Sequence, residues 1–413
     1  MLKTLAVSAI IATSALTLVR AEAATTIPFA SWQLQEPGSG QWWADAIAAF
    51  EEANPDIDIE EVYIPFADYL PQMTVRFAAN RPPAVIQLSE QMFGSFAQQG
   101  WFAGLDDHIK GTDIETGWAP AQAGLDWDGE SRGVLLSNSP MMLFYNKDLL
   151  AEAGVDVPAS FAEFKAAVGE MTDRDAGRFG LSAVTTEHPT AVEELHRYTK
   201  WAGTSLVKDG AYNLTAPEVV DALESYRQTV SANAPLGNNS SVARQLFIDG
   251  RTSFLIDGPW VWNWLERATP QMRPKLVMDR APFDPQIGPG GLTMHVAAGL
   301  SDEQENAAWE FVQFVMQPEW QKRFVIATGQ PAGRAASVLD EAAAAEYPHL
   351  GVTSEAAGEA EPMFPKNKAI QANFAKYSSI LMEAALRLLS TDDPTEEIMA
   401  DAQAQLETSV PLN

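Results

Sequence analysis

The sequence predicts an α/β fold, because strand-like and helix-like segments alternate along its first hundred residues. Thr26–Trp32 has the composition of a short strand that ends in a polar loop. In the next segment, Trp43, Ile47 and Phe50 fall at the i, i+4, i+7 spacing of one helix face. This order of strand and then amphipathic helix is typical of a parallel sheet that helices cover.

The alternation continues through two more strands. Asn54-Pro55 stops the first helix, and Asp56–Ile64 then alternates apolar and polar residues as a half-buried strand does. A second helix is expected around Tyr69–Ala79, and Ala84–Leu88 reads as a short buried strand. The first hundred residues therefore predict the order β-α-β-α-β.

Two polar loops follow strands of this predicted sheet. Residues 33–38 come after the first strand and residues 89–91 after the third. In parallel α/β sheets, ligands bind at the carboxyl ends of the strands. These loops are therefore the first candidates for a binding site.

The rest of the chain is richer in predicted helices. Between Tyr145 and Met278 the strand candidates are short, at residues 180–184 and 252–256. Farther along, Asp302–Val325 has the pattern of one long helix, and Phe374–Leu388 forms another amphipathic face. We found no internal repeat in the sequence.

The amino-acid composition limits the classes of protein to which the chain can belong. A chain of 413 residues predicts two or three domains. Its 27 Lys and Arg against 55 Asp and Glu give a net charge of −28, which argues against binding nucleic acid or anionic lipid. It contains no cysteine, which excludes disulfides, thiolate metal sites, cysteine nucleophiles and a lipid-modified N-terminal cysteine.

The N-terminus, residues 1–23, has the pattern of a secretory signal peptide. Lys3 gives a positive start, Leu5–Val19 is apolar, and Ala21-Glu22-Ala23 matches the cleavage-site pattern of small residues. A membrane anchor is the alternative, but about 15 apolar residues fall short of the roughly 20 that span a bilayer. We therefore predict an exported protein that begins near Ala24.

The sequence contains no strong catalytic or metal-binding signature. Nucleophile-elbow and phosphate-loop motifs are absent, and the five histidines lack ligand spacing. Asp126-x-Asp128-Gly129 only partly matches a calcium loop. A carboxylate pair for glycoside hydrolysis stays open, since it depends on three-dimensional separation. The sequence favours binding over catalysis, with no metal and no cofactor.

Five segments, in order, resemble one family, the extracellular solute-binding proteins of bacterial ABC importers, in the sugar-binding branch of the maltose and multiple-sugar type. Each segment matches a family motif, and together they extend over nearly the whole mature chain. The segments are Phe50–Asp56, Phe93–Asp106, Met142–Gly154, Phe247–Trp260 and Ala307–Glu319, the fourth ending in Gly-Pro-Trp.

The resemblance implies two α/β lobes joined by a hinge that the chain crosses three times. The crossings are expected near residues 137–141, 291–294 and 331–336. The N-terminal lobe then comprises residues 24–138 and 293–333, and the C-terminal lobe residues 139–292 and 334–413. It also implies a monomer in the periplasm that closes over a small-molecule ligand and docks on an ABC permease, with no lipid anchor.

The resemblance and the strand ends together suggest the ligand-binding residues. Trp260, of the Gly-Pro-Trp motif, is expected to stack on a sugar ring, whereas Trp262 and Trp264 are expected to be core or interlobe residues. Polar contacts are predicted from loops of the first lobe and from the hinge: Trp32, Gln33, Gln35, Glu36, Ser89, Glu90, Gln91, Ser139, Gly291 and Arg334.

The identity of the ligand is left open by the sequence. Arg334 suggests a small glycoside with an anionic group. A receptor of the same fold for a non-sugar ligand, such as glycerol phosphate, a polyamine or a metal chelate, is one alternative. An exported carbohydrate-active enzyme is the other.

Overall fold

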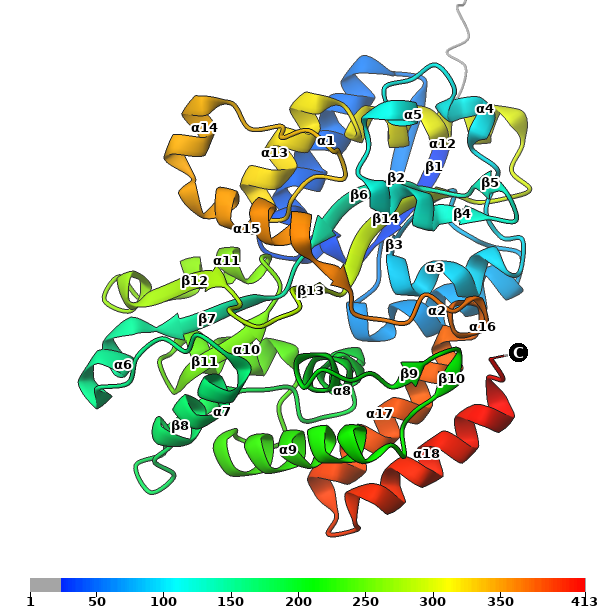
Figure 1. Ribbon diagram of the computed structural model, residues 1–413. Helices are drawn as coiled ribbons and strands as arrows, with labels where there is room; N and C mark the ends of the chain where they lie inside the picture. The colour runs from blue at the N-terminus through cyan, green and yellow to red at the C-terminus, as the bar shows by residue number, and fades with distance from the viewer. Residues whose placement is uncertain (1–23, 413) are drawn as a thin grey trace, which may run out of the picture.

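The computed structural model describes residues 24–412 and contains two lobes, each built around its own sheet (Figure 1). The predicted signal peptide lies outside the described residues. The first lobe holds a five-stranded sheet and the second a four-stranded sheet. In sheet order the strands are β2 (Ile57–Tyr63), β1 (Thr25–Ser31), β3 (Val85–Ser89), β14 (Gly290–Val296) and β6 (Val134–Ser139), then β12 (Leu276–Arg280), β7 (Met142–Asn146), β11 (Thr252–Asp257) and β8 (Phe179–Ser182).

The predicted β-α-β-α-β order of the first lobe is confirmed. Helix α1 (Ser39–Ala53) buries Trp43, Ile47 and Phe50, and its C-cap is Asn54. Helix α2 (Phe66–Ala78) then leads to β3, and β1 lies parallel to both β2 and β3. Because the three strands are parallel, the segments that follow them lie at one edge of the sheet.

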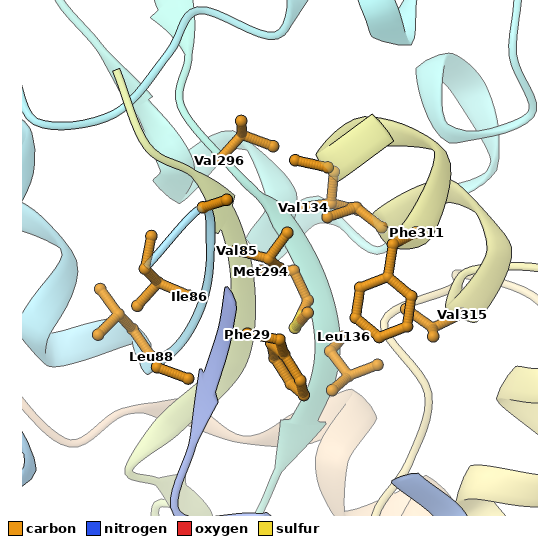
Figure 2. Close-up of a cluster of buried hydrophobic side chains, with 14 of the residues drawn as sticks. Phe29, Val85, Ile86, Leu88, Val134, Leu136, Met294, Val296, Phe311 and Val315 are labelled. Atoms are coloured by element: carbon orange, nitrogen blue, oxygen red, sulfur yellow. The ribbon is translucent and has the colours of Figure 1, made fainter. Parts of the chain in front are cut away.

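The core of the first lobe lies between its sheet and the helices that cover it (Figure 2). Phe29 of β1 contacts Trp43 at a ring-centroid distance of 4.5 Å and Phe311 at 5.3 Å. Phe311 belongs to α12 (Asp302–Val315), which joins this core from far along the chain. Each such buried ring contributes about 1.5–3 kcal/mol to stability.

The prediction of one helix over residues 302–325 was wrong. The segment forms two helices, α12 and then α13 (Pro318–Thr328). Pro318 cannot donate a backbone hydrogen bond and disfavours helical geometry in the residue before it. The chain therefore turns at Met316 and Gln317, and Pro318 starts a new helix at its first position.

The second lobe is mostly helical, as expected. Its sheet is covered by α7, α8, α9 and α10, and the two helices α17 and α18 close its outer side (Figure 1). Both observed strands β8 and β11 match their predicted positions within two residues. The bounds are α6 (Lys147–Ala153), α7 (Phe161–Glu170), α8 (Pro189–Trp201), α9 (Pro217–Asn233), α10 (Ser240–Ile248), α11 (Val261–Trp264), α17 (Phe374–Ser390) and α18 (Thr395–Ser409).

Two crossings between the lobes lie where strands of the two sheets follow each other. Pro140 and Met141 connect β6 to β7, and Pro289 connects the short strand β13 (Ile287–Gly288) to β14. The second crossing therefore precedes residues 291–294, because these already pair with β3 and β6. The hinge edge of the first-lobe sheet is thus β14 and β6.

The third crossing lies beyond the predicted position at residue 334. The backbone of Arg334 bridges Trp118, and Ala335 donates a hydrogen bond to Gly117, so both residues stay with the first lobe. Helix α14 (Glu341–Glu346) follows, and α15 (Pro348–Glu359) packs against β12 of the second lobe. The chain therefore changes lobes between α14 and α15, later than the domain boundary that the sequence suggested.

His295, which is fully buried in β14, makes stability depend on pH. Its ring stacks on Phe102 at 4.3 Å, and burial lowers its pKa to about 4. An unfolded histidine takes up a proton near pH 6.5, whereas His295 in the folded protein does not. Its contribution to the free energy of unfolding is therefore present above pH 6.5 and is lost as the pH falls toward 4.

The difference in free energy of unfolding between wild type and His295→Gln is expected to shrink by about 2 kcal/mol from pH 7 to pH 5. The variant lacks the titrating ring, so only the wild type loses this part of its free energy of unfolding at low pH. Urea unfolding of both proteins at each pH measures the difference. A difference that does not change with pH would show that His295 titrates normally.

Candidate functional site

A cavity of about 380 Å³ lies between the lobes and is the candidate binding site. This volume is in the range of small-molecule sites. It is lined by residues of both lobes and of the hinge. First-lobe residues include Trp32, Gln33, Gln35, Glu36, Pro37, Tyr63, Phe66, Ser89 and Gln91. Second-lobe residues include His188, Thr190, Glu193, Asn239–Ser241, Arg244, Asp257, Trp260, Trp264 and Arg267. Hinge residues include Ser139, Pro289–Leu292 and Gln330.

The carboxyl end of β1 supplies one wall of this cleft. After Ser31 the chain forms a short 3-10 turn over Gln33–Gln35, and the Gln33 backbone N–H donates to the Ser31 hydroxyl at 2.9 Å. The Gln33 side-chain oxygen accepts a hydrogen bond from Gln87 at 2.6 Å. Both bonds fix the loop, which presents Trp32, Gln35 and Glu36 to the cavity.

Most of the predicted site residues come together here. The cavity is lined by Trp32, Gln33, Gln35, Glu36, Ser89, Gln91, Ser139, Trp260 and Gly291. They come from the carboxyl ends of β1 and β3, from the hinge strands and from the turn after β11. Parallel strands place their carboxyl ends at one edge, which is why loops distant in sequence share one site.

Glu90 and Arg334 do not line this cavity. Glu90 forms an ion pair with Lys366 and accepts the backbone N–H of Gly291 at 3.1 Å. Arg334 donates to Asp113 at 2.7 Å, and its guanidinium lies 4.4 Å from the Trp118 ring centroid. Both side chains thus bind partners within the protein. Arg334 is therefore not placed to bind an anionic ligand in the cleft.

The three tryptophans of the segment Asp257–Leu265 have different surroundings. Within the described chain, neither an aromatic ring nor a cation stacks on Trp260, which is half-buried and lines the cavity. Trp262 lies between His349, at a ring-centroid distance of 3.9 Å, and Arg273, at 4.4 Å. Trp264 lines the cavity but carries Arg267 over its ring at 4.3 Å. Trp260 thus has the ring best placed for a ligand, and Trp264 is not purely a core residue.

Replacing Trp262 with alanine is expected to lower the free energy of unfolding by about 3 kcal/mol, because its ring is covered on both faces. Ligand affinity should change less than threefold, since Trp262 does not line the cavity. Urea unfolding and ligand titration of the same variant test both statements. A stable variant with lost affinity would place Trp262 in the site instead.

An ion pair between Arg244 and Asp257 lies in the second-lobe wall, and sequence reasoning missed it. Arg244 of α10 contacts both carboxylate oxygens of Asp257, Nε at 2.8 Å and Nη2 at 3.2 Å. Asp257 also accepts the backbone N–H of Gly258 at 2.8 Å. The polar run Asn238–Ser241, which leads into α10, is a sequence signal that could have indicated this wall.

Two further carboxyl groups line the cleft, Glu36 from the first lobe and Glu193 from α8. Burial raises the pKa of Glu36 to about 7, with Arg244 acting in the opposite direction and Asp257 adding to the rise. Burial likewise raises the pKa of Glu193 to about 7, against the effect of Arg197. Near neutral pH both groups can therefore accept or donate a hydrogen bond.

His188 precedes α8 and also lines the cavity. Its Nδ1 accepts the backbone N–H of Thr190 at 3.2 Å, which caps the helix. Burial and the charge of Arg244 lower the pKa of His188 to about 4. The ring is therefore neutral at physiological pH, and its Nε2 lies 3.3 Å from the hydroxyl of Ser240.

A two-lobed α/β chain with a polar and aromatic cleft at its hinge has the architecture of a ligand-capture protein. The family model of bacterial extracellular solute-binding proteins matches residues 45–352. The chain therefore belongs to the bacterial extracellular solute-binding protein family. Among residues 24–412 there is no helix with the length and apolar character needed to cross a membrane.

Curated relatives agree with this family. A protein of Brucella abortus (strain 2308) that is named only as a binding protein is 26% identical over 297 residues, which is 69% of this chain and 71% of that protein. The sn-glycerol-3-phosphate-binding periplasmic protein of Rhizobium meliloti (strain 1021) is 23% identical over 332 residues, 72% of this chain and 76% of that one.

Solved structures show the same fold. Maltose-bound MalE3 of T. maritima superposes with a TM-score of 0.83 at 19% identity, over 93% of this chain and 100% of that chain. The GacH receptor of Streptomyces glaucescens, solved unliganded and with acarbose, has a TM-score of 0.82 at 20% identity, over 94% and 99% of the two chains. The two-lobe fold predicted from the sequence is confirmed.

Proposed function

We propose that the protein is the periplasmic receptor of an ABC importer, which captures a sugar or small glycoside between its lobes and delivers it to a membrane permease. The observation that carries this proposal is the ring of Trp260, which lines a cleft together with polar side chains of both lobes. A sugar has apolar C–H faces that stack on an aromatic ring and hydroxyls that need donors and acceptors.

Polar groups of the cleft suit those hydroxyls. Gln35, Gln91, Asn239 and Ser139 present amides and a hydroxyl, and Glu36 adds a carboxyl. The two lobes contribute to one cavity, so a ligand that contacts both favours the closed arrangement over an open one. Structures and relatives that bind maltose, acarbose and galactooligosaccharide support a sugar for this chain.

Other features fit a freely diffusing receptor. The signal-peptide pattern and the missing N-terminal cysteine favour export to the periplasm without a lipid anchor. We propose that the receptor acts as a monomer, because ligand capture needs only the two lobes of one chain. The net charge of −28 disfavours a nucleic-acid partner.

A second candidate ligand is a glycerol phosphodiester. It is favoured by UgpB of Mycobacterium tuberculosis, solved with glycerophosphocholine, whose fold matches at a TM-score of 0.81. The Rhizobium meliloti relative is named for the related monoester sn-glycerol 3-phosphate. Arg267 at the cleft would be its anion partner, since Arg244 is already paired with Asp257. A carbohydrate-active enzyme is the third alternative, to which Glu36 and Glu193 would contribute carboxyl groups.

A thermal-shift screen of the mature protein separates these alternatives. The panel comprises neutral mono-, di- and oligosaccharides, acidic sugars and glycerophosphodiesters. A ligand at 100 times its Kd adds about 2.7 kcal/mol of stability, and we expect this with at least one sugar. A rise in melting temperature with phosphodiesters alone would overturn the sugar proposal. If chromatography shows that the protein consumes the sugar, the protein is an enzyme instead.

A further inference from the structure

Glu193 is a buried carboxyl group that faces the cleft without a partner. Its exposed fraction is 8%, and it lines the cavity from the first turns of α8. Within residues 24–412 its side chain makes neither a hydrogen bond nor an ion pair. Its neighbour Glu194 shows the contrast, because that carboxylate forms an ion pair with Arg197. A buried carboxyl group without a partner costs free energy unless something else satisfies it.

Glu36 presents a second such group from the opposite lobe. It too lines the cavity, and among the described residues its carboxyl has neither a hydrogen-bond nor an ion-pair partner. Both Glu36 and Glu193 interact electrostatically with the Arg244–Asp257 pair, so they share one region of the cleft. The two lobes thus bring two carboxyl groups without a protein partner to the same cleft.

The two arginines that act on these carboxyl groups are already paired with other carboxylates. Arg244 makes both of its close contacts with Asp257, and Arg197 pairs with Glu194 and donates to the carbonyl of Ile256 at 3.0 Å. Arg267 is exposed and lies over the ring of Trp264. His188 is neutral at physiological pH. Neither Glu36 nor Glu193 therefore has an arginine of its own as an ion-pair partner within residues 24–412.

The aromatic lining of the cleft also suits a positive charge. Trp32, Tyr63, Phe66 and Trp260 line the same cavity as the two carboxyl groups. Aromatic faces attract ammonium groups, most strongly where water is displaced, and a carboxylate beside them adds charge-assisted hydrogen bonds. A neutral sugar offers hydroxyls to the carboxyls but no charge.

We propose that the natural ligand is a polyhydroxylated molecule with a positively charged amino group, which Glu193 binds from the second lobe and Glu36 from the first. This inference rests on the proposed function, the capture of a sugar-like ligand in this cleft. It narrows that function from sugars in general to amino sugars and related amino-bearing glycosides.

Proton uptake and release distinguish this ligand from a neutral sugar. A cationic ligand favours the charged form of both carboxyl groups, lowers their pKa and releases protons near neutral pH. Its affinity therefore rises between pH 6 and pH 8 while its amine stays protonated. A neutral sugar that accepts hydrogen bonds from protonated Glu36 or Glu193 would bind more weakly as the pH rises.

Calorimetric titration with matched ligands tests the proposal. The amine probes are 6-amino-6-deoxyglucose, glucosamine and the chitobiose-type disaccharide of glucosamine. Their neutral counterparts are glucose, N-acetylglucosamine and the N-acetylated disaccharide. We expect at least one amine to bind about tenfold or more tightly than its neutral counterpart. Repeating the titration of 6-amino-6-deoxyglucose, whose alkylamine stays protonated at neutral pH, in buffers of different ionisation enthalpy should show net proton release.

The variant Glu193→Gln should bring the ratio of the amine's affinity to that of the neutral counterpart close to one. Glu187→Gln removes the same charge from an exposed position outside the cavity and should leave the ratio unchanged. Neutral sugars that bind as tightly as their amines, or tighter, would overturn this inference and leave the proposed function intact. Binding of no sugar at all, with or without an amine, would overturn both.

Discussion

Replacing Trp260 with alanine is expected to lower ligand affinity by about 100-fold or more. The free energy of unfolding should change by no more than about 1 kcal/mol, because the ring is half-buried and carries no other ring or cation within the described chain. Ligand titration followed by intrinsic fluorescence measures the affinity, and urea unfolding measures the stability. The matched control is Trp262→Ala, which should show the opposite pattern.

The position of the ring can be tested without removing it. A Cβ atom added at Gly258 would lie 2.1–2.4 Å from three atoms of the Trp260 ring, so the ring packs directly on this glycine. Gly258→Ala should therefore displace the ring and weaken binding although Trp260 is still present. Full affinity in both Trp260→Ala and Gly258→Ala would mean that the ligand does not stack there.

Replacing Arg197 with leucine is expected to cost about 3–5 kcal/mol of stability, the largest loss we expect from a single charge. Arg197 is 1% exposed, pairs with Glu194 and donates to the carbonyl of Ile256. Its removal leaves Glu193 and Glu194 buried on α8 without a nearby cation on that helix. Urea unfolding at pH 7 measures the loss.

The matched control is Arg323→Leu. Arg323 also pairs with a glutamate on its own helix, Glu319, but both side chains are more than half exposed. Its loss should cost less than about 1 kcal/mol, because solvent screens the pair. Equal losses in the two variants would contradict the importance of burial at Arg197.

Much of the fold followed from local patterns in the sequence. The strand and helix spacing between Thr26 and Leu88 predicted the first lobe, because apolar periodicity directly reflects which face of an element is buried. The helix break at Pro318 was missed because apolar residues continue on both sides of it. The boundaries of the lobes were harder to predict. Arg334 belongs to the first lobe because its backbone pairs with Trp118, which is more than 200 residues away in sequence.

Site residues could be predicted where they follow a strand or belong to a family motif. They could not be predicted where their role depends on contacts between residues that are distant in sequence. The loops after β1 and β3 and the ring of Trp260 came from those two signals. Arg244 and Glu193 did not, because nothing in the local sequence distinguishes them from the other polar residues of α10 and α8. Their role depends on Asp257 and Glu36, which only the folded chain brings near.

The central claim is that a sugar-like ligand is bound, intact, between the two lobes against Trp260. A crystal structure of the mature protein with the tightest ligand from the thermal-shift screen tests it most directly. We predict a ligand ring on the free face of Trp260, with polar contacts to Glu36 from the first lobe and Glu193 from the second. A ligand bound outside the cleft, or cleaved within it, would contradict the claim.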